Sequence, residues 1–372
     1  MFENVVETFF EMVQIDSPSG AEASFRQWLI NAFEKLQGQP ETDATGNLKI
    51  NIPGILDKPP LLFAAHMDTV EPGCGIRPQR LPDGRIVSAG DTVLGADDKD
   101  GITAILCAIQ EIKLQNLPHP PLELLFTVSE ENNLGGSRNL PADWLQARQG
   151  WVFDGPGELG SIYRNGVGKQ GFLLQVEGQA AHAAICPEDG RNAFAAMAEG
   201  ILSFLPGRRE NATLNYGTIQ GGHADNIVPD RVELTLEIRS HDSVRLAQLA
   251  TQMQTCWQAA VKKHGCHLQC THGSSYPAFA LPATSPHYQY TVSILQKLGL
   301  SPQLKNFNAG CDANYLCAAG LDLCVIATGR KANHSVAETT TYANLKCLSK
   351  IAFHLMTGAE LLSHASSKQP AS

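Results

Sequence analysis

Short apolar stretches that end in polar residues constrain the fold of this chain more than any other feature. The stretch LLFAAHMDTV, Leu61 to Val70, begins with five apolar residues and then reaches His66 and Asp68. Similar apolar stretches occur in LELLFTVS, GWVFD and LCVIATG, and helical patterns lie between them. Apolar strands that alternate with helices are typical of a mostly parallel sheet with helices on both faces. The expected fold class is α/β, with a mixed, mostly parallel sheet flanked by helices.

The pattern changes after Asp154, and a chain of 372 residues is too long for one ordinary core. Strand-like FLLQVEG, TLNYGTIQGG and RVELTLEIRS alternate with two helical runs in the order βαββαβ, which predicts an inserted antiparallel α+β domain. The α/β pattern returns near Pro277. The expected boundaries are 1–166 and 276–364 for the α/β domain, 167–275 for the insertion, and 365–372 for a disordered tail.

Composition excludes several kinds of partner. The net charge of −9 argues against nucleic acid and against an anionic membrane surface. No stretch reaches the ~18 uninterrupted apolar residues of a membrane span, and the acidic N-terminus does not resemble a secretory signal. The ten cysteines are scattered, which does not suggest a disulfide framework. We expect a soluble, cytoplasmic protein with a small-molecule substrate.

Acidic residues and histidines gather just after the predicted strands or just before a helix. Taken singly, each has an ordinary explanation as a helix cap, a solvated carboxylate or a surface histidine. Ligands of open α/β sheets bind beyond the carboxyl ends of the strands, so these side chains can converge on one crevice. The set comprises His66, Asp68, Asp97, Asp98, Asp100, Glu130, Glu131, Asp154 and His334.

So many carboxylates in one crevice would repel one another unless cations balanced them. Histidine and carboxylate ligands without cysteine suit Zn²⁺ first, with Co²⁺ or Mn²⁺ as alternatives. Two such ions ~3.5–4 Å apart, bridged by a carboxylate and a water molecule, form a hydrolytic centre. The sequence therefore predicts a metal-dependent hydrolase.

Two other motifs predict little. GVGKQG, Gly166 to Gly171, matches the GxGxxG pattern of a dinucleotide site, but a strand rather than a helix follows it. This leaves little support for a nucleotide-dependent oxidoreductase. HGCHLQCTH, His264 to His272, lacks a second ligand pair at zinc-finger spacing.

The motifs, taken in order, resemble the M20 family of dizinc metallopeptidases. They are the HxD of 66–68, GADDKDG before a helix, the Glu130–Glu131 pair, DGPGELG and a late histidine. The resemblance covers roughly residues 5 to 360 and is closest to the peptidase T (tripeptide aminopeptidase) branch. It implies a dizinc exopeptidase fold in which the inserted domain serves as a lid and dimerisation domain, and a homodimer formed through that domain.

The resemblance also implies a role for each ligand. Asp97 would bridge the two metals, His66 and Asp154 would complete one metal site, and Glu131 and His334 would complete the other.

Two further residues would support this centre. Asp68 would accept a hydrogen bond from His66 and fix its tautomer, and Glu130 would be the general base. The resemblance further implies a cis peptide bond between Asp97 and Asp98.

In the inserted domain the resemblance implies three functional residues. His182 would reach the active site of a neighbouring subunit and stabilise the oxyanion of the reaction, and Asn226 and Arg239 would bind substrate. The ordinary alternatives are a structural histidine and a surface arginine at a strand edge.

Two stretches depart from the family pattern. Ala309 to Asp312 replace a Gly-Gly-Ser-Asp-type turn near the substrate pocket, and Arg330 and Lys331 form an unusual basic pair beside His334. We expect this basic pair to suit an anionic end of the substrate.

The predicted function is hydrolysis of a peptide bond in short peptides by a zinc-bridging water. Two alternatives stay open at this point. One is an amidohydrolase that acts on N-acyl amino acids, and the other is a non-catalytic metal-binding relative.

Overall fold

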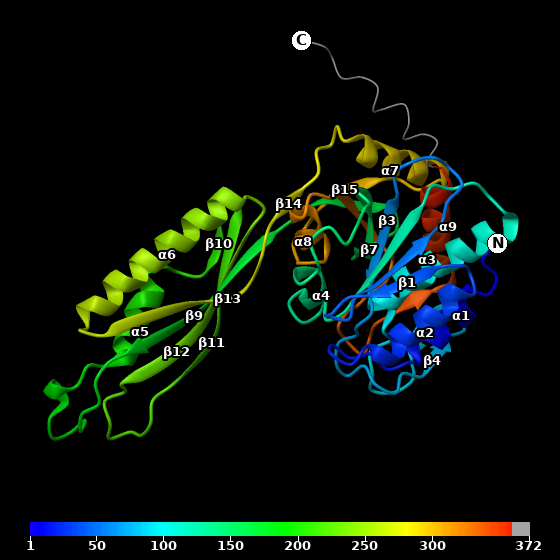
Figure 1. Cartoon of the computed structure of the whole chain (residues 1–372). Coiled ribbons are helices and arrows are strands. Elements are labelled where there is room, and N and C mark those ends of the chain that lie inside the picture. Colours follow the sequence, from blue (N-terminus) through cyan, green and yellow to red (C-terminus); the bar gives the residue numbers. More distant parts are fainter. Residues whose placement is uncertain (359–372) are drawn as a thin grey trace, which may run out of the picture. The chain divides into compact units, whose positions relative to one another are not determined.

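The computed structural model describes residues 1–358, which divide into two compact units. Unit 1 comprises Met1–Asn165 together with the described chain from Ala280 onward, and unit 2 comprises Gly166–Phe279. Each has its own apolar core. The expected tail, 365–372, lies outside the described residues. Figure 1 shows the chain coloured along its sequence.

Unit 1 is built on a mixed sheet with the strand order β1-β2-β6-β3-β7-β16-β8-β14, and β15 pairs with β8. Strand β3 is parallel to β6 and to β7, and β16 is parallel to β7. The strands are β1 (Gln39–Thr42), β2 (Leu48–Ile52), β3 (Leu61–His66), β6 (Leu122–Thr127), β7 (Gln149–Gly155), β8 (Ser161–Gly166), β14 (Phe279–Ala280), β15 (Gln303–Phe307) and β16 (Asp322–Ala327).

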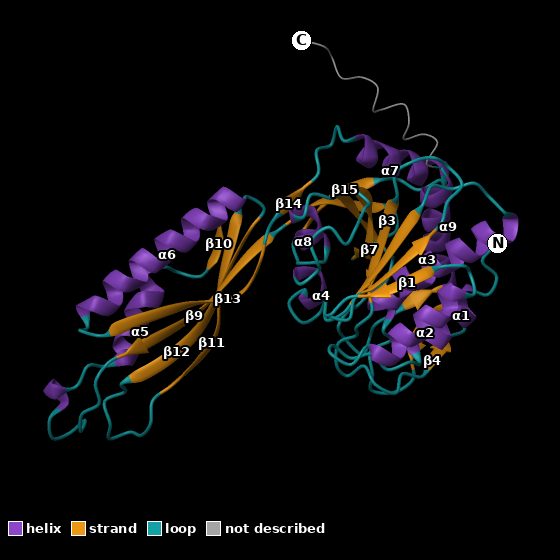
Figure 2. Cartoon of the chain, in the orientation of Figure 1, coloured by secondary structure: helices purple, strands orange, loops and turns teal. Residues whose placement is uncertain are grey.

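Helices of unit 1 pack on this sheet and on one another (Figure 2). Helix α3 contacts β3, β7, α1 and α9, and α7 lies against α9 and β16. Strands β3 and β6 are buried along their whole length, as their apolar sequences predict. The helices are α1 (Val5–Val13), α2 (Ala23–Glu34), α3 (Ala96–Gln115), α4 (Gly135–Arg138), α7 (Pro286–Lys297), α8 (Ala313–Ala318) and α9 (Tyr342–Thr357).

A small sheet that the sequence did not predict lies in the same unit. Its strand order is β17-β5-β4, with β4 (Pro78–Arg80), β5 (Arg85–Ser88) and β17 (Thr340–Thr341). These strands are only two to four residues long, which is too short to show a clear alternation in the sequence.

Unit 2 is an antiparallel sheet with two helices packed on one face (Figure 2). The strand order is β10-β11-β12-β9-β13, so the expected βαββαβ pattern carries one additional short strand, β10. The elements are β9 (Gly168–Glu177), a short 3₁₀ helix (Pro187–Asp189), α5 (Ala193–Ser203), β10 (Gly207–Arg209), β11 (Ala212–Gly221), β12 (Arg231–Ser240), α6 (Ser243–Lys263) and β13 (His267–Tyr276). The fold class expected from the sequence is confirmed.

Candidate metal centre

Parallel strands bring the polar residues of unit 1 to one edge of its sheet. His66 ends β3 opposite Thr127, the last residue of β6, and Gly155 at the end of β7 lies opposite Ala327 at the end of β16. The carboxyl ends of four strands therefore lie along one edge, and helix α3 begins beside them at Ala96. Twelve residues line a pocket of about 160 Å³ at this edge, among them both predicted metal histidines and the Glu130–Glu131 pair.

One group of metal-type ligands consists of His66, Asp97 and Asp154. Nε2 of His66 lies 3.1 Å from Oδ1 of Asp97 and 3.9 Å from Oδ1 of Asp154. All three side chains are buried.

A second group uses the other oxygen of the same aspartate. Nε2 of His334 lies 3.3 Å from Oδ2 of Asp97 and 2.9 Å from Oε1 of Glu131. Asp97 thus presents one oxygen to each group, which is the geometry of a bridging carboxylate. Asn333 donates a hydrogen bond from Nδ2 to the same Oδ2 at 2.9 Å.

Asp68 connects the end of β3 to the loop after β6. Its carboxylate accepts hydrogen bonds from the backbone N–H groups of Glu130 (2.9 Å) and Glu131 (3.1 Å), and from the hydroxyl of Ser19 (2.6 Å). Nδ1 of His66 lies 3.3 Å from Oδ1 of Asp68 and 3.0 Å from its backbone oxygen. A single buried carboxylate therefore orients the imidazole and both glutamates.

The backbone around Asp97 departs from a regular helix. The N–H groups of Gly95 and Asp97 donate to the carboxylate of Glu338 at 2.8 and 2.9 Å. Asp97 (ψ 101°) and Asp98 lie outside helical geometry, although both fall within α3, which begins at Ala96. The Asp97–Asp98 peptide bond is cis, as the family resemblance predicted.

The electrostatics of the pocket show crowded like charges. Burial, followed by the charge of Asp154, raises the pKa of Glu130 well above its usual value. Burial and the charge of Asp97 raise the pKa of Asp154 to about 7. Hydrogen bonds with Asp97 and Glu131 raise the pKa of His334 to about 10. Burial and neighbouring negative charge both disfavour the ionised carboxylates, and divalent cations bound among them would counter both effects.

The donor set fits divalent metal ions. Residues 1–358 contain three overlapping groups of possible ligands: the two described above and a third that consists of His66, Glu130 and Glu131. Within each group the ligand atoms lie within 4.8 Å of one another, and all three groups lie in this pocket. Their donors are imidazole nitrogens and carboxylate oxygens without thiolates, which suits zinc and similar borderline or harder ions. The cysteines are all free, and none belongs to these groups.

The position of Arg330 shows that one prediction from the sequence was wrong. The sequence suggested a cation available to an anionic substrate end, but the Arg330 side chain is buried, with 2% of its surface exposed. Its guanidinium pairs with the carboxylates of Asp97, Asp98, Asp100 and Asp154 at 2.6–3.0 Å. The neighbouring Lys331 is exposed. Four aspartates near the strand ends hold Arg330 inside the protein, because a buried guanidinium needs anionic partners.

The remaining three candidate residues belong to unit 2. His182 is exposed, and its Nδ1 accepts hydrogen bonds from the N–H groups of Ala184 and Ile185, both at 3.2 Å. Asn226 is also exposed, and its backbone carbonyl accepts the N–H of Ala183 at 2.9 Å. His182 and Asn226 therefore lie on two neighbouring chain segments that are joined by a backbone hydrogen bond.

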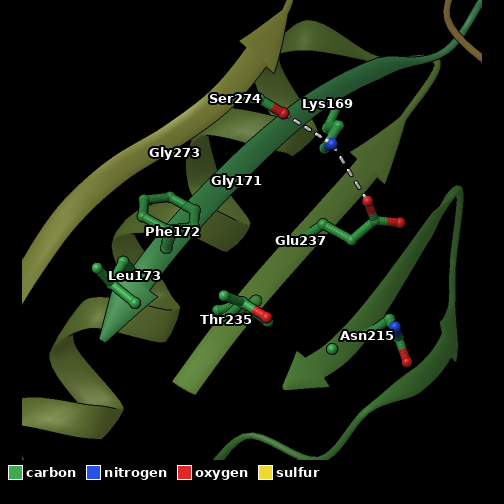
Figure 3. A pocket seen from close by; sticks show the side chains of 11 residues that line it. Lys169, Gly171, Phe172, Leu173, Asn215, Thr235, Glu237, Gly273 and Ser274 are labelled. Atoms are coloured by element: carbon green, nitrogen blue, oxygen red, sulfur yellow. Dashed lines mark hydrogen bonds and ion pairs between the residues drawn. The ribbon is translucent and has the colours of Figure 1, made fainter. Parts of the chain in front are cut away.

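Arg239 is half-buried on β12 and already has a partner. Nε and Nη2 donate to the two carboxylate oxygens of Glu237 at 2.8 and 3.0 Å. Glu237 also lines a pocket of about 370 Å³ on the sheet of unit 2, where Lys169 lies between it and Ser274 (Figure 3). This pocket is larger than that at the metal-type ligands, but the groups of metal-type ligands found in residues 1–358 all lie in unit 1. We therefore assign the candidate centre to unit 1.

Two residues at this centre were missed from the sequence, Asn333 and Glu338. Asn333 and Glu338 flank His334 in the chain but carry no pattern that separates them from ordinary loop residues. Asp98 accepts the backbone N–H of His66 at 3.2 Å, so its carboxylate supports the ligand rather than joining the ligand groups. Ala309 and Gly310 line the pocket, as expected for the turn in which this chain departs from the family pattern.

Comparison with known proteins identifies the family. The uncharacterised protein YqjE of Bacillus subtilis is 30% identical over 345 residues, which cover 90% of this chain and 93% of that protein. The structure of aminopeptidase PepT from Bacillus cereus matches with a TM-score of 0.91 and 30% identity, covering 98% of this chain and 99% of that one. A tripeptidase from Staphylococcus aureus matches with a TM-score of 0.93, 28% identity and the same coverage. Residues 167–265 match the peptidase dimerisation domain of M20 enzymes.

The chain belongs to the M20 peptidase family. It is a metallopeptidase-type hydrolase similar to peptidase T, which confirms the predicted family and enzyme class. No helix in residues 1–358 has both the length and the apolar character needed to cross a membrane.

Proposed function

We propose that this protein removes residues from the end of short peptides by metal-assisted hydrolysis at the pocket of unit 1. One observation carries the proposal: Asp97 offers one oxygen to the His66 group and the other to the His334 group. The similarity to an aminopeptidase PepT and to a tripeptidase over nearly the whole chain supports short peptides as the substrate class.

The chain's own residues would hold two divalent ions. His66, Asp97 and Asp154 would hold one, and Asp97, Glu131 and His334 the other. When bound, the ions would supply Lewis-acid activation of a peptide carbonyl and of a water molecule. Zinc suits this donor set first, and Co²⁺ or Mn²⁺ are alternatives.

Glu130 is proposed as the general base. A carboxylate oxygen of Glu130 lies within 4.8 Å of ligand atoms of His66 and Glu131. The Glu130 side chain is buried, and its backbone N–H donates to Asp68. In this position the carboxylate could take a proton from a water molecule bound in the pocket. The same carboxyl would then deliver that proton to the leaving amine.

Unit 2 would complete the enzyme in a homodimer. Its match to a dimerisation domain supports this assembly, in which His182 would stabilise the oxyanion in a neighbouring subunit. Asn226 and Arg239 would bind substrate. Because Glu237 already occupies the guanidinium of Arg239, capture of a substrate carboxylate would require an exchange of partner. We also propose that the protein acts in the cytoplasm.

The test replaces Glu130 by Gln, which keeps the shape of the side chain and removes the base. We expect turnover of tripeptides to fall by ~10²–10⁴-fold, while the metal content measured by atomic emission stays unchanged. Glu7→Gln, at an exposed position of α1, is the matched control and should keep full activity. Near-normal activity of Glu130→Gln would exclude this base.

A panel of dipeptides, tripeptides and N-acyl amino acids tests the substrate class with the same enzyme. Preference for tripeptides or dipeptides with a free amino end supports the proposal. Turnover of N-acyl amino acids alone would instead identify an amidohydrolase.

A further inference from the structure

The guanidinium of Arg330 contacts the atoms that would bind one of the two ions. Nη2 lies 2.6 Å from Oδ1 of Asp97 and 2.6 Å from Oδ1 of Asp154. Nη1 lies 2.7 Å from Oδ1 of Asp98 and 3.0 Å from Oδ1 of Asp100. Both terminal nitrogens are thus held by two carboxylates each.

The two ligand groups differ in their relation to this arginine. The oxygens of Asp97 and Asp154 that Nη2 contacts are the same atoms that face Nε2 of His66. The other group uses Oδ2 of Asp97, which accepts a hydrogen bond from the neutral amide of Asn333 and lies 3.3 Å from Nε2 of His334. Arg330 therefore pairs with both carboxylates of the first group, whereas in the second group it pairs with Asp97 alone, through the oxygen that faces the first group.

Electrostatics then makes the two positions unequal. An ion held by these two oxygens would lie close to Nη2, because Nη2 contacts both of them. A fixed positive charge in a buried site repels a divalent cation, and it also weakens the carboxylates as donors. The second group is separated from Nη2 by the carboxylate of Asp97 itself.

We propose that Arg330 lowers the metal affinity of the His66–Asp97–Asp154 position, so that the protein holds one ion tightly at Asp97–Glu131–His334 and a second ion weakly. This inference rests on the proposed function, because it requires that the pocket bind two ions. Arg330 would act through the carboxylates of Asp97 and Asp154 and not by contact with the substrate. The activity would then follow the occupancy of the weaker position and respond to the concentration of free metal.

The experiment measures metal affinity rather than turnover. Metal-stripped, full-length protein is titrated with Zn²⁺ against a chromophoric chelator, and with Co²⁺ by visible absorption. We expect two binding steps separated on the order of 100-fold, the size that one nearby positive charge produces when it is partly screened. His334→Ala should abolish the tighter step and leave a weak one.

Variants at position 330 separate charge from shape. In Arg330→Met, which keeps an unbranched side chain without the charge, the two steps should converge to within about tenfold. Arg330→Lys keeps the charge and should keep the two steps apart. Lys331→Met removes the exposed neighbouring cation and is the matched control, so its two steps should resemble those of the unaltered protein.

Two results would overturn the inference. One is equal affinity of the two positions in the unaltered protein, which is decisive even if Arg330→Met fails to fold. The other is loss of the weaker step in Arg330→Met, because that would mean that Arg330 helps to build the position. Failure of the proposed function looks different: the unaltered protein would bind fewer than two ions under any condition, or Glu130→Gln would stay active.

Discussion

At the scale of single residues, Asp68 connects several parts of the candidate centre. It is fully buried, and it accepts hydrogen bonds from Ser19 and from the backbones of Glu130 and Glu131. Burial alone would raise its pKa, but hydrogen bonding and charge interaction with His66 outweigh burial and lower the pKa. Asp68 is therefore anionic at neutral pH and holds His66 with Nδ1 protonated, so that Nε2 faces Asp97.

Replacing Asp68 by Asn tests this support. The amide has one acceptor oxygen where the carboxylate has two, so at least one buried N–H loses its partner. We expect zinc affinity to fall by ~10–100-fold, with a parallel fall in kcat/KM, measured by chelator competition and peptide hydrolysis. Asp57→Asn, in an exposed loop, is the control. Unchanged zinc affinity in Asp68→Asn would show that the carboxylate does not orient the ligands.

At the scale of elements, the start of helix α3 is set by its close approach to strand β7. A Cβ atom added at Gly101 would lie 2.5 Å from the backbone oxygen of Phe153 and 2.9 Å from Oδ1 of Asp98. Asp97 stands at the start of this helix and Asp154 follows Phe153 in β7. The absence of a side chain at Gly101 therefore allows the two carboxylates to approach each other.

Replacing Gly101 by Ala should destabilise the protein, although alanine usually stabilises a helix relative to glycine. Alanine normally stabilises a helix interior by ~1 kcal/mol relative to glycine. Here the methyl group would have to move the helix away from β7, so we expect a loss of about 1–3 kcal/mol in the free energy of unfolding by urea, and weaker zinc binding. Gln110→Ala, on the exposed side of the same helix, should leave both quantities nearly unchanged. A stabilised Gly101→Ala would contradict the close packing.

At the scale of the whole molecule, the two units have separate cores. The apolar cluster of unit 2 contains Trp257, whose indole N–H donates to the hydroxyl of Tyr216 at 3.0 Å. The groups of metal-type ligands in residues 1–358 lie in unit 1. An ion that binds the folded form of one unit stabilises that unit, and a chain with two cores need not unfold in a single step.

Removal of metal should therefore affect the two units differently. We expect a chelator to lower the stability of unit 1 by about 3 kcal/mol relative to protein in metal at 100 times its Kd, and to leave unit 2 nearly unchanged. Hydrogen exchange followed by mass spectrometry measures both, with peptides from 166–279 as the internal control. Equal acceleration of exchange in both units would contradict this prediction.

Much of the fold could be predicted because its signals are local. Fully apolar runs such as Leu61–Ala65 identified strands buried on both faces, and the alternation in RVELTLEIRS identified β12 of the antiparallel sheet. The strands of the β17-β5-β4 sheet and β10 were missed because they are too short to show a period.

The sequence by itself determined which residues could meet. His66, Glu130, Glu131 and Asp154 follow apolar strands, and the carboxyl ends of parallel strands share one edge, so their convergence needs no long-range information. Only the tertiary structure decided where Arg330 points. Its position beside Lys331 and His334 suggested a cation that binds substrate. Instead, aspartates more than 170 residues away in the chain hold Arg330 inside the protein. Side-chain direction in a loop depends on such distant partners, because no periodic backbone pattern sets it.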